Sequence, residues 1–387
     1  MAVRKPGIQS LTGLFIAALL LLFISGCSDS SDFHAPIIPD IPEDAVLMNQ
    51  LQYLGTHNSY HIQPKADVFE LLIAFIADLA LTLEYTHVPL QQQFESQGIR
   101  QIELDIFHDP EGGLYADHQA RTLFGEEAAS GIAELDEPGL KVLHVQEVDY
   151  ETTCYTFVSC LQEIKMWSDS NPGHLPIMVL VEAKDEVIDD PLNLNFVIPV
   201  EFGRVALDLI DTEVRSVFPE SQLIMPDNIR GTFSTLEGAV LSQGWLPLSE
   251  ARGRIMFALD NGGHTRDTYI EGHPSLEGRI LFTDSAPGTA EAAFMKRNDP
   301  LGDPEEIKLL VEQGYMVRTR ADADTEQARN GDTTRREAAF DSGAHFISTD
   351  YPVPDPDFTD YQVTMPGGNI ARCNPVNAND SCTPDLF

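Results

Sequence analysis

The chain has 387 residues and 43% of them are hydrophobic, which is enough for one large domain or two ordinary ones and argues against disorder throughout. Its formal net charge is −37 at pH 7. This acidic balance argues against nucleic-acid binding, which needs a basic footprint, and against simple electrostatic attraction to anionic bilayers. We interpret the charge as a solvated acidic surface.

The first segment has the pattern of an export signal. Arg4 and Lys5 precede the apolar run LTGLFIAALLLLFI, which closes on ISGC. A transmembrane helix is the alternative, but the run is short and ends in small residues. ISGC resembles a bacterial lipobox. The resemblance implies that residues 1–26 are a lipoprotein signal peptide, that Cys27 is lipidated, and that the exported protein reaches the outer membrane or cell surface, as Ser28 also indicates.

Residues 27–46 are rich in Ser, Asp and Pro and are predicted to be a flexible tether. Residues 47–387 then form the folded region, including a C-terminal tail that carries two cysteines.

Four cysteines remain besides the one in the lipobox. In an exported protein, two pairs close in sequence predict disulfides. A zinc site made of four cysteines is disfavoured because neither pair has CxxC spacing. The predicted disulfides are Cys154–Cys160 and Cys373–Cys382.

Short apolar runs alternate with helix-like stretches over most of the remaining chain. This alternation predicts a parallel sheet, and eight runs predict a (β/α)8 TIM barrel, with a doubly wound sheet as the alternative. SQLIMP (221–226) is a possible ninth strand that we interpret as part of an insertion. The runs span residues 51–56, 99–106, 141–145, 175–183, 254–260, 279–284, 315–320 and 345–350, and helices are expected within 89–98, 157–171, 202–218 and 303–314.

Polar side chains close most of these runs at their C-terminal ends. In a barrel this rim carries the active site. A single residue of this kind is usually an ordinary strand-end group, but the series points to a site. It comprises His57, Asn58, Glu103, Asp105, His144, Glu182, Lys184, Asp260, Asp284, Arg318, Arg320 and Asp350.

Two carboxylates lie in the second run, IRQIELDI. Because side chains alternate along a strand, Glu103 and Asp105 share one face, and the branched apolar residues face the helices. Buried like charges at this spacing repel unless a proton or a cation lies between them. Oxygen ligands without cysteine suit Ca²⁺, or less well Mg²⁺, better than zinc.

Other rim residues could complete a cation site or replace the cation. Asn58 and Glu182 could supply two more oxygen ligands. Alternatively, Lys184, Arg318 and Arg320 could neutralise the carboxylates through salt bridges. The residues alone leave both possibilities open.

Three histidines are candidates for acid–base chemistry. Two histidines around a phosphate can act as base and acid in phosphodiester cleavage. His57 ends the first run, His118 lies in the loop after the second run, and His144 ends the third. Spacing does not decide whether His118 or His144 is the partner of His57.

Several motifs in order carry a family resemblance. GTHNSYH, then GIRQIELDIF, YADHQA, KVLHVQEVDY and HLPIMVLVEAKD resemble the Ca²⁺-dependent phosphoinositide-specific phospholipase C family of bacterial secreted and lipoprotein enzymes, and the catalytic X region of the eukaryotic enzymes. The resemblance covers residues 47–355 and implies a phospholipase C-like barrel that uses Ca²⁺.

The resemblance assigns roles to individual residues. It implies that His57 is the first catalytic histidine, that Asn58 binds calcium, and that Glu103 and Asp105 are the calcium-binding E-x-D pair. It also makes Glu182 a calcium ligand.

The second catalytic histidine is implied to be His118, although Gln119 stands where the eukaryotic enzymes have glycine. His144 is the reserve candidate. Lys184 and Arg318 are assigned to substrate binding by their place at the rim.

The implied reaction is attack of the inositol 2-hydroxyl on phosphorus, giving diacylglycerol and a cyclic inositol phosphate. The expected partner is a membrane phospholipid, with the protein a lipid-anchored monomer that binds no nucleic acid. The alternatives are a glycerophosphodiester phosphodiesterase on the same barrel, which resembles HRG where this chain has HNS, and a non-catalytic ligand-binding lipoprotein.

Residues 68–85 form a broad apolar stretch after the first run. Its position predicts an insertion over the rim that caps the site and touches the bilayer. Packing onto the barrel as core is the alternative.

Overall fold

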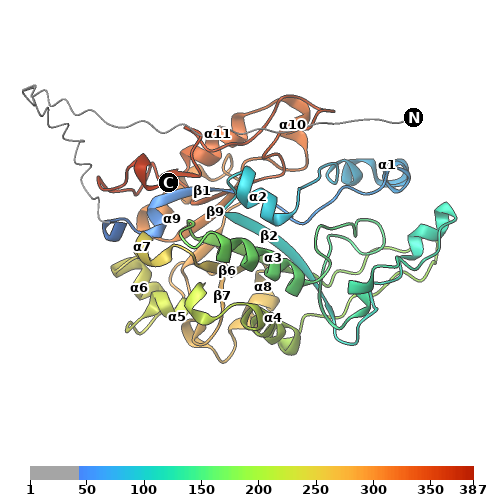
Figure 1. Cartoon of the computed structure of the whole chain (residues 1–387), viewed down its shortest axis with the longest axis horizontal. Coiled ribbons are helices and arrows are strands. Elements are labelled where there is room, and N and C mark those ends of the chain that lie inside the picture. Colours follow the sequence, from blue (N-terminus) through green and yellow to red (C-terminus); the bar gives the residue numbers. More distant parts are fainter. Residues whose placement is uncertain (1–42) are drawn as a thin grey trace, which may run out of the picture. The chain divides into compact units, whose positions relative to one another are not determined.

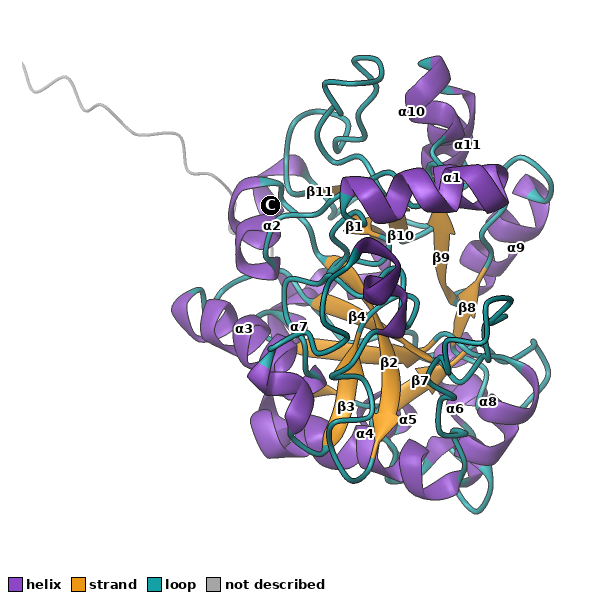
Figure 2. Cartoon of the chain, turned by 90° about the vertical axis from the view of Figure 1, so that its right-hand side faces the viewer, coloured by secondary structure: helices purple, strands orange, loops and turns teal. Residues whose placement is uncertain are grey.

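A computed structural model describes residues 43–387, so the predictions for residues 1–26, for Cys27 and for the tether up to residue 42 lie outside the described residues. Within the described residues, no helix is both long and apolar enough to cross a bilayer. This part of the chain is built on a curled, mostly parallel sheet with helices around its outside (Figures 1 and 2).

The sheet contains the strands predicted from the apolar runs and several short ones besides. Most of its strands are completely buried, and their branched and aromatic side chains form one large core with the surrounding helices. The strands are β1 (Leu51–Thr56), β2 (Gln101–Asp109), β3 (Gly139–Val142), β4 (Ile177–Ala183), β5 (Leu223–Ile224), β6 (Ile255–Leu259), β7 (Leu281–Thr283), β8 (Phe294–Lys296), β9 (Met316–Arg320), β10 (Phe346–Thr349) and β11 (Ala371–Cys373).

The parallel strands follow the order β6-β4-β2-β1-β10-β9-β8, and β7 pairs with the other edge of β6. Between β7 and β8 only one parallel bridge is present among the described residues, from Asp284 to Phe294. The mixed α/β fold with a curled parallel sheet is therefore established. The complete (β/α)8 barrel stays a prediction, because one bridge is not a continuous ladder.

The prediction of a parallel strand at 141–145 is wrong. β3 runs antiparallel to the far half of β2, with Val142 opposite Ile106 and Gly139 opposite Asp109. β2 continues past the predicted end of its run, and its extension pairs with β3. An apolar run alone does not reveal strand direction. SQLIMP contributes the two-residue strand β5 beside β6.

Helices occupy the stretches between the strands where the amphipathic pattern predicted them. Thr156 caps α3, because its side chain accepts a hydrogen bond from the Ser159 backbone N–H. The helices are α1 (Ala66–Leu81), α2 (Leu90–Ser96), α3 (Phe157–Ser170), α4 (Arg204–Val217), α5 (Pro226–Arg230), α6 (Leu236–Ser242), α7 (Leu248–Ala251), α8 (Gly263–Ile270), α9 (Pro304–Gln313), α10 (Glu326–Asn330) and α11 (Thr334–Asp341).

Both predicted disulfides, Cys154–Cys160 and Cys373–Cys382, are present. The second one closes the C-terminal tail. Its first cysteine ends β11, which pairs antiparallel with the start of β1. The tail thus supports the strand that leads into the GTHNSY turn.

The turn after β1 is held by close packing and hydrogen bonds. Gly55 lies opposite Gln101 of β2, and a Cβ at Gly55 would lie only 2.8 Å from the Gln101 Cβ. The Thr56 hydroxyl donates to the Gln93 side chain at 2.7 Å, and Gln93 donates to the Ser59 carbonyl at 2.6 Å. Asn58 has a φ of 41°, a left-handed conformation that asparagine tolerates better than most residues.

Replacing Gly55 with alanine is expected to destabilise the protein by about 1–3 kcal/mol, because the added methyl group would press on the base of the Gln101 side chain between two paired strands. Urea unfolding of Gly55→Ala and wild type measures the difference. Gly173→Ala is the control, since a Cβ at Gly173 meets nothing within 4 Å. Equal stability of the two variants would contradict this account of the turn.

Candidate active site

Three neighbouring parallel strands bring three polar residues together at their C-terminal ends. His57 follows β1, Asp350 follows β10, and Arg320 ends β9. Asp350 Oδ1 lies 2.9 Å from His57 Nδ1, and Arg320 Nη2 donates to Asp350 Oδ2 at 2.9 Å. The buried Asp350 carboxylate thus contacts both the Arg320 guanidinium and the His57 imidazole.

The partners of His57 define its tautomer. Arg320 can only donate, and its Nη1 lies 3.4 Å from His57 Nε2, so Nε2 accepts. The proton is then on Nδ1, where Asp350 accepts it. Burial would raise the pKa of Asp350, but His57 and Arg320 hold it well below its ordinary value. An anionic carboxylate holding Nδ1–H leaves Nε2 able to take a proton.

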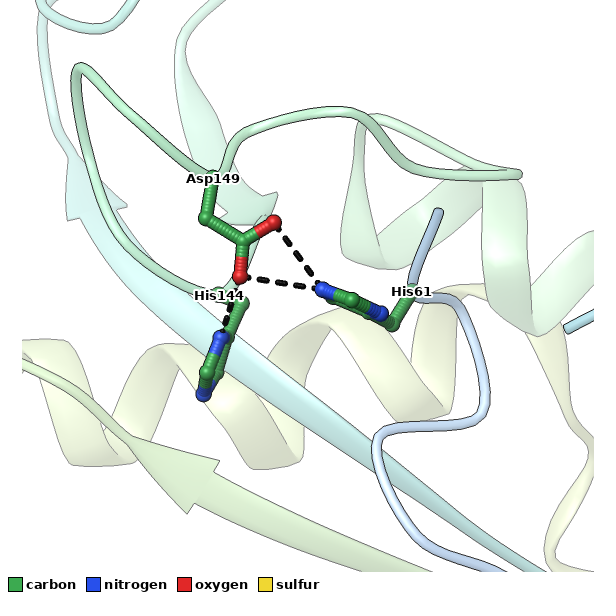
Figure 3. Close-up of side chains that lie close together, drawn as sticks. All are labelled: His61, His144 and Asp149. Atoms are coloured by element: carbon green, nitrogen blue, oxygen red, sulfur yellow. Dashed lines mark hydrogen bonds and ion pairs between the residues drawn. The ribbon is translucent and has the colours of Figure 1, made fainter. Parts of the chain in front are cut away.

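A second histidine network lies beside the first (Figure 3). His144 donates from Nδ1 to Asp149 Oδ2 at 2.6 Å, and His61 Nε2 lies 2.9 Å from both Asp149 oxygens. His61 Nδ1 lies 3.0 Å from the Tyr85 carbonyl oxygen. Both ring nitrogens of His61 therefore face acceptors, and both carry protons.

The protonation of the His61 ring determines whether the network can bind a metal ion. Burial favours the neutral imidazole, but Asp149 raises the pKa of His61 above its ordinary value and so favours the protonated ring. A doubly protonated histidine offers no lone pair to a metal ion. The cluster of His61, His144 and Asp149 is close enough to hold a cation, but its hydrogen bonds argue for proton chemistry.

His118 is not among the residues that line a cavity together with His57. His118 is buried, with its ring stacked on Tyr150 at a centroid distance of 3.4 Å. Burial, with Arg121 and Lys65 nearby, lowers the pKa of His118 to about 3. The role of His118 as the second catalytic histidine stays a prediction. The alternative candidate, His144, lines a cavity together with His57.

Three carboxylates converge where β2 and β4 run side by side. Asp105 lies opposite Glu182 in the register of the two strands. One oxygen each of Glu103, Asp105 and Glu182 lies within 4.8 Å of the others. Burial and the charge of Asp105 raise the pKa of Glu182 well above its ordinary value. The cluster is thus electrostatically strained without further positive charge.

Basic side chains neutralise part of the negative charge of the three carboxylates, which is one of the two possibilities left open by the sequence. Arg318, assigned to substrate binding, donates from Nη2 to Glu103 Oε2 at 2.5 Å. Lys184 Nζ lies 3.3 Å from Asp105 Oδ2. Burial would raise the pKa of Glu103, but Arg318 lowers it. The substrate-binding roles of Arg318 and Lys184 stay predictions.

Unpaired oxygens remain in the cluster and fit a hard cation. Asp105 Oδ1 is buried and has no hydrogen-bond or ion-pair partner among the described residues, whereas Oδ2 has only the Lys184 ammonium at 3.3 Å. Asn58 donates from Nδ2 to the Tyr85 hydroxyl at 3.1 Å, and its buried Oδ1 has no hydrogen-bond partner there either. The Ser59 backbone N–H donates to the Glu103 carbonyl at 2.9 Å, which keeps the Asn58 turn beside β2. Carboxylate and amide oxygens are the donors that Ca²⁺ prefers.

A cavity of about 880 Å³ is lined by His57, Arg320, Asp350 and His144, whereas Asn58 and the three carboxylates are not among its lining residues. We call it the main cavity. Most of its remaining wall is apolar and comes from α1, from the segment 120–123 and from the loop 188–196. His118 is not among its lining residues. Figure 1 shows α1 and the teal segments near residues 110–150 projecting on one side of the sheet.

Sequence reasoning missed the residues that orient the others. Tyr85, His61 and Asp149 follow no predicted strand end, and although His61 and Asp149 lie within the quoted motifs GTHNSYH and KVLHVQEVDY, the sequence predicts no role for them. Asp149 lies five residues after His144 in the motif HVQEVD, and this adjacency is the one signal that could have linked them.

A family model described as phosphoinositide phospholipase C, Ca²⁺-dependent, matches residues 46–375. No curated protein matches the chain significantly.

Solved structures show a similar fold. A calcium-dependent phosphoinositol-specific phospholipase C from Pseudomonas sp, in its apo form, is 15% identical with a TM-score of 0.52, and the match covers 86% of this chain and 96% of that one. Its myoinositol complex gives 15% identity, a TM-score of 0.51, and coverage of 86% and 97%. At this identity the likeness concerns the fold alone.

Calcium is expected to raise the melting temperature of the protein, because an ion that binds only the folded state stabilises that state. At a free calcium concentration about one hundred times Kd, the free energy of unfolding should rise by about 2.7 kcal/mol. Differential scanning calorimetry with and without Ca²⁺ measures the shift. Asp105→Asn should lose most of it, because a charged ligand is removed.

Glu111→Gln is the matched control, since Glu111 is exposed in the loop after β2. It should keep the full shift. A shift that survives both Asp105→Asn and Glu182→Gln would place calcium elsewhere.

Proposed function

Because the chain belongs to the Ca²⁺-dependent phosphoinositide phospholipase C family, and is therefore a phosphodiesterase, we propose that it cleaves the glycerol–phosphate bond of an inositol phospholipid. The observation that carries this proposal is the meeting of two carboxylate-held histidines at one cavity, with a cluster of three carboxylates on the nearby strands β2 and β4. The myoinositol complex of the Pseudomonas enzyme supports inositol as the head group.

His57 is the proposed base. Its Nε2 carries a lone pair, and Asp350 stabilises the imidazolium that forms when Nε2 takes the proton of the inositol 2-hydroxyl. The hydroxyl oxygen then bonds to phosphorus, and the bond from phosphorus to the glycerol oxygen breaks. Arg320, at 3.4 Å from Nε2, is placed to attract the anionic phosphate.

His144 is the proposed acid, in place of His118. It lines the main cavity with His57, and Asp149 holds its Nδ1, so Nε2 is the nitrogen left for the leaving group. Burial lowers the pKa of His144 in the ligand-free protein. An anionic phosphate beside the ring would favour its protonated form. His144 then donates this proton to the departing diacylglycerol oxygen, and a cyclic inositol phosphate is left.

Asn58, Glu103, Asp105 and Glu182 are the proposed calcium ligands. When bound, calcium would offset the carboxylate repulsion, lower the pKa of the attacking hydroxyl and stabilise charge on the phosphoryl oxygens. Ca²⁺ suits this set better than Mg²⁺, because its coordination tolerates more oxygens and looser geometry. The complete (β/α)8 barrel belongs to the proposal as well, and the bridge between β7 and β8 supports it.

The two alternatives are less well supported. A glycerophosphodiester phosphodiesterase would share the barrel, but no separate observation favours glycerol over inositol. A non-catalytic binding protein would have little use for two histidines that are each held by a buried carboxylate.

We further propose that the protein is an exported lipoprotein, acting on membrane phospholipid as a monomer anchored through Cys27. The two disulfides support an oxidising compartment. Mass spectrometry of the protein purified from membranes should find an N-terminal lipidated Cys27, and Cys27→Ser should release the protein from them. An unmodified N-terminus at Met1 would contradict the anchor.

Activity is expected to require calcium and both proposed catalytic histidines. Release of cyclic inositol phosphate from phosphatidylinositol, followed by ³¹P NMR, should occur in Ca²⁺ but not in EDTA. His57→Ala and His144→Ala should each lower kcat about 10²–10⁴-fold, the usual range for a lost acid or base.

His264→Ala serves as the control, because His264 is exposed on α8. His118→Ala should cost less than His144→Ala, and the reverse order would restore His118 as the acid. Faster cleavage of glycerophosphocholine than of phosphatidylinositol would favour the glycerophosphodiesterase alternative.

A further inference from the structure

α1 covers the main cavity without becoming part of the protein core. Its buried residues Leu72 and Ala80 belong to a small apolar cluster of their own, whose only member beyond the segment 68–83 is Val148. Other side chains of the helix remain open to solvent, with Phe75 73% and Leu79 60% exposed. Burial therefore does not explain the apolar sequence of this helix.

The apolar residues of α1 face other apolar residues across the main cavity. Leu72, Phe75 and Leu79 form one wall. Leu123, Leu192 and Phe196 are also in the lining and come from two loops that are distant in sequence. The carboxylates of Asp189 and Asp324 also line the cavity, but both are exposed and can stay hydrated. A wall made of three separate segments encloses a volume, whereas a flat membrane-contacting patch needs only one.

The same cavity contains the proposed reacting groups. His57, Arg320 and Asp350 are hydrogen-bonded to one another and form one polar group within this apolar lining. A phosphodiester held at His57 has two arms. The inositol arm is polar and needs hydrogen-bonding partners. The arm that carries the glycerolipid is apolar, and the apolar walls are the surface that matches it.

We propose that the apolar part of the main cavity binds an acyl chain of the substrate, so that part of the lipid tail enters the protein during cleavage. The proposal rests on the proposed function and adds to it the recognition of the lipid tail. The occupant is one chain of the same lipid whose phosphate lies at His57. It differs from simple contact between α1 and a bilayer, because a chain inside the cavity is bound even when no bilayer is present.

Monomeric short-chain lipids test this directly. kcat/KM of the purified protein in Ca²⁺ is measured for glycerophosphoinositol, dibutyroyl phosphatidylinositol and dihexanoyl phosphatidylinositol, all below their aggregation concentrations. Each methylene that enters the cavity should raise kcat/KM up to about fourfold, equivalent to about 0.8 kcal/mol. Values that do not change with chain length would overturn the proposal and favour contact with the bilayer.

The double variant Phe75→Ser with Leu79→Ser tests the cavity wall. Both side chains are exposed, so the fold should survive. The gain in kcat/KM from dibutyroyl to dihexanoyl lipid should fall severalfold. The matched control is Val187→Ser with Ile198→Ser, two residues that are 65% and 68% exposed and lie outside the lining. It should keep the wild-type gain, and equal loss in both double variants would overturn the assignment.

A binding measurement separates this proposal from the proposed function. Calorimetric titration with dihexanoylglycerol, the expected product, should show binding to wild type that is severalfold weaker in the Phe75→Ser with Leu79→Ser variant. If dihexanoylglycerol binds in this way but phosphatidylinositol is not cleaved, the proposed function fails and the apolar site stands. If phosphatidylinositol is cleaved but dihexanoylglycerol does not bind, the apolar site fails alone.

Discussion

The repulsion among three clustered carboxylates, two of them buried and one half-buried, is the constraint on which the site depends. Glu103, Asp105 and Glu182 are held within 4.8 Å of one another by two paired strands that cannot move apart without breaking the sheet. Arg318 and Lys184 offset part of this charge. Asp105 Oδ1 and Asn58 Oδ1, which have no partner among the described residues, are oxygens that a further cation could bind. In the proposed mechanism calcium binding and catalysis are coupled, because the proposed ligand Asn58 is the residue next to His57.

Strand order explains why residues far apart in the sequence act together. β1, β10 and β9 are neighbours, so their C-terminal ends bring His57, Asp350 and Arg320 into contact. The opposite neighbours of β1 are β2 and then β4, which carry the carboxylates. β1 therefore lies between the strands that carry Asp350 and Arg320 and the strands that carry the three carboxylates.

The sequence predicted the features that follow from alternating side chains and from the ends of strands. It did not predict which strands and side chains become partners through packing. Strand β1, both disulfides and the proximity of Glu103, Asp105 and Glu182 follow from local pattern. The direction of β3 does not, because an apolar run pairs equally well either way. The antiparallel pairing of β3 and the hydrogen bond to Asp149 position His144. Tyr85, which orients Asn58, belongs to a segment with no strand pattern.

The position of the calcium ion tests the central claim most directly. Crystals grown with Ca²⁺ and inositol phosphate, measured for anomalous scattering, should show one peak coordinated by Asn58 Oδ1 and by oxygens of Glu103, Asp105 and Glu182. The phosphate should lie between this peak and His57. A peak at His61, His144 and Asp149 instead, or none in saturating calcium, would contradict the account.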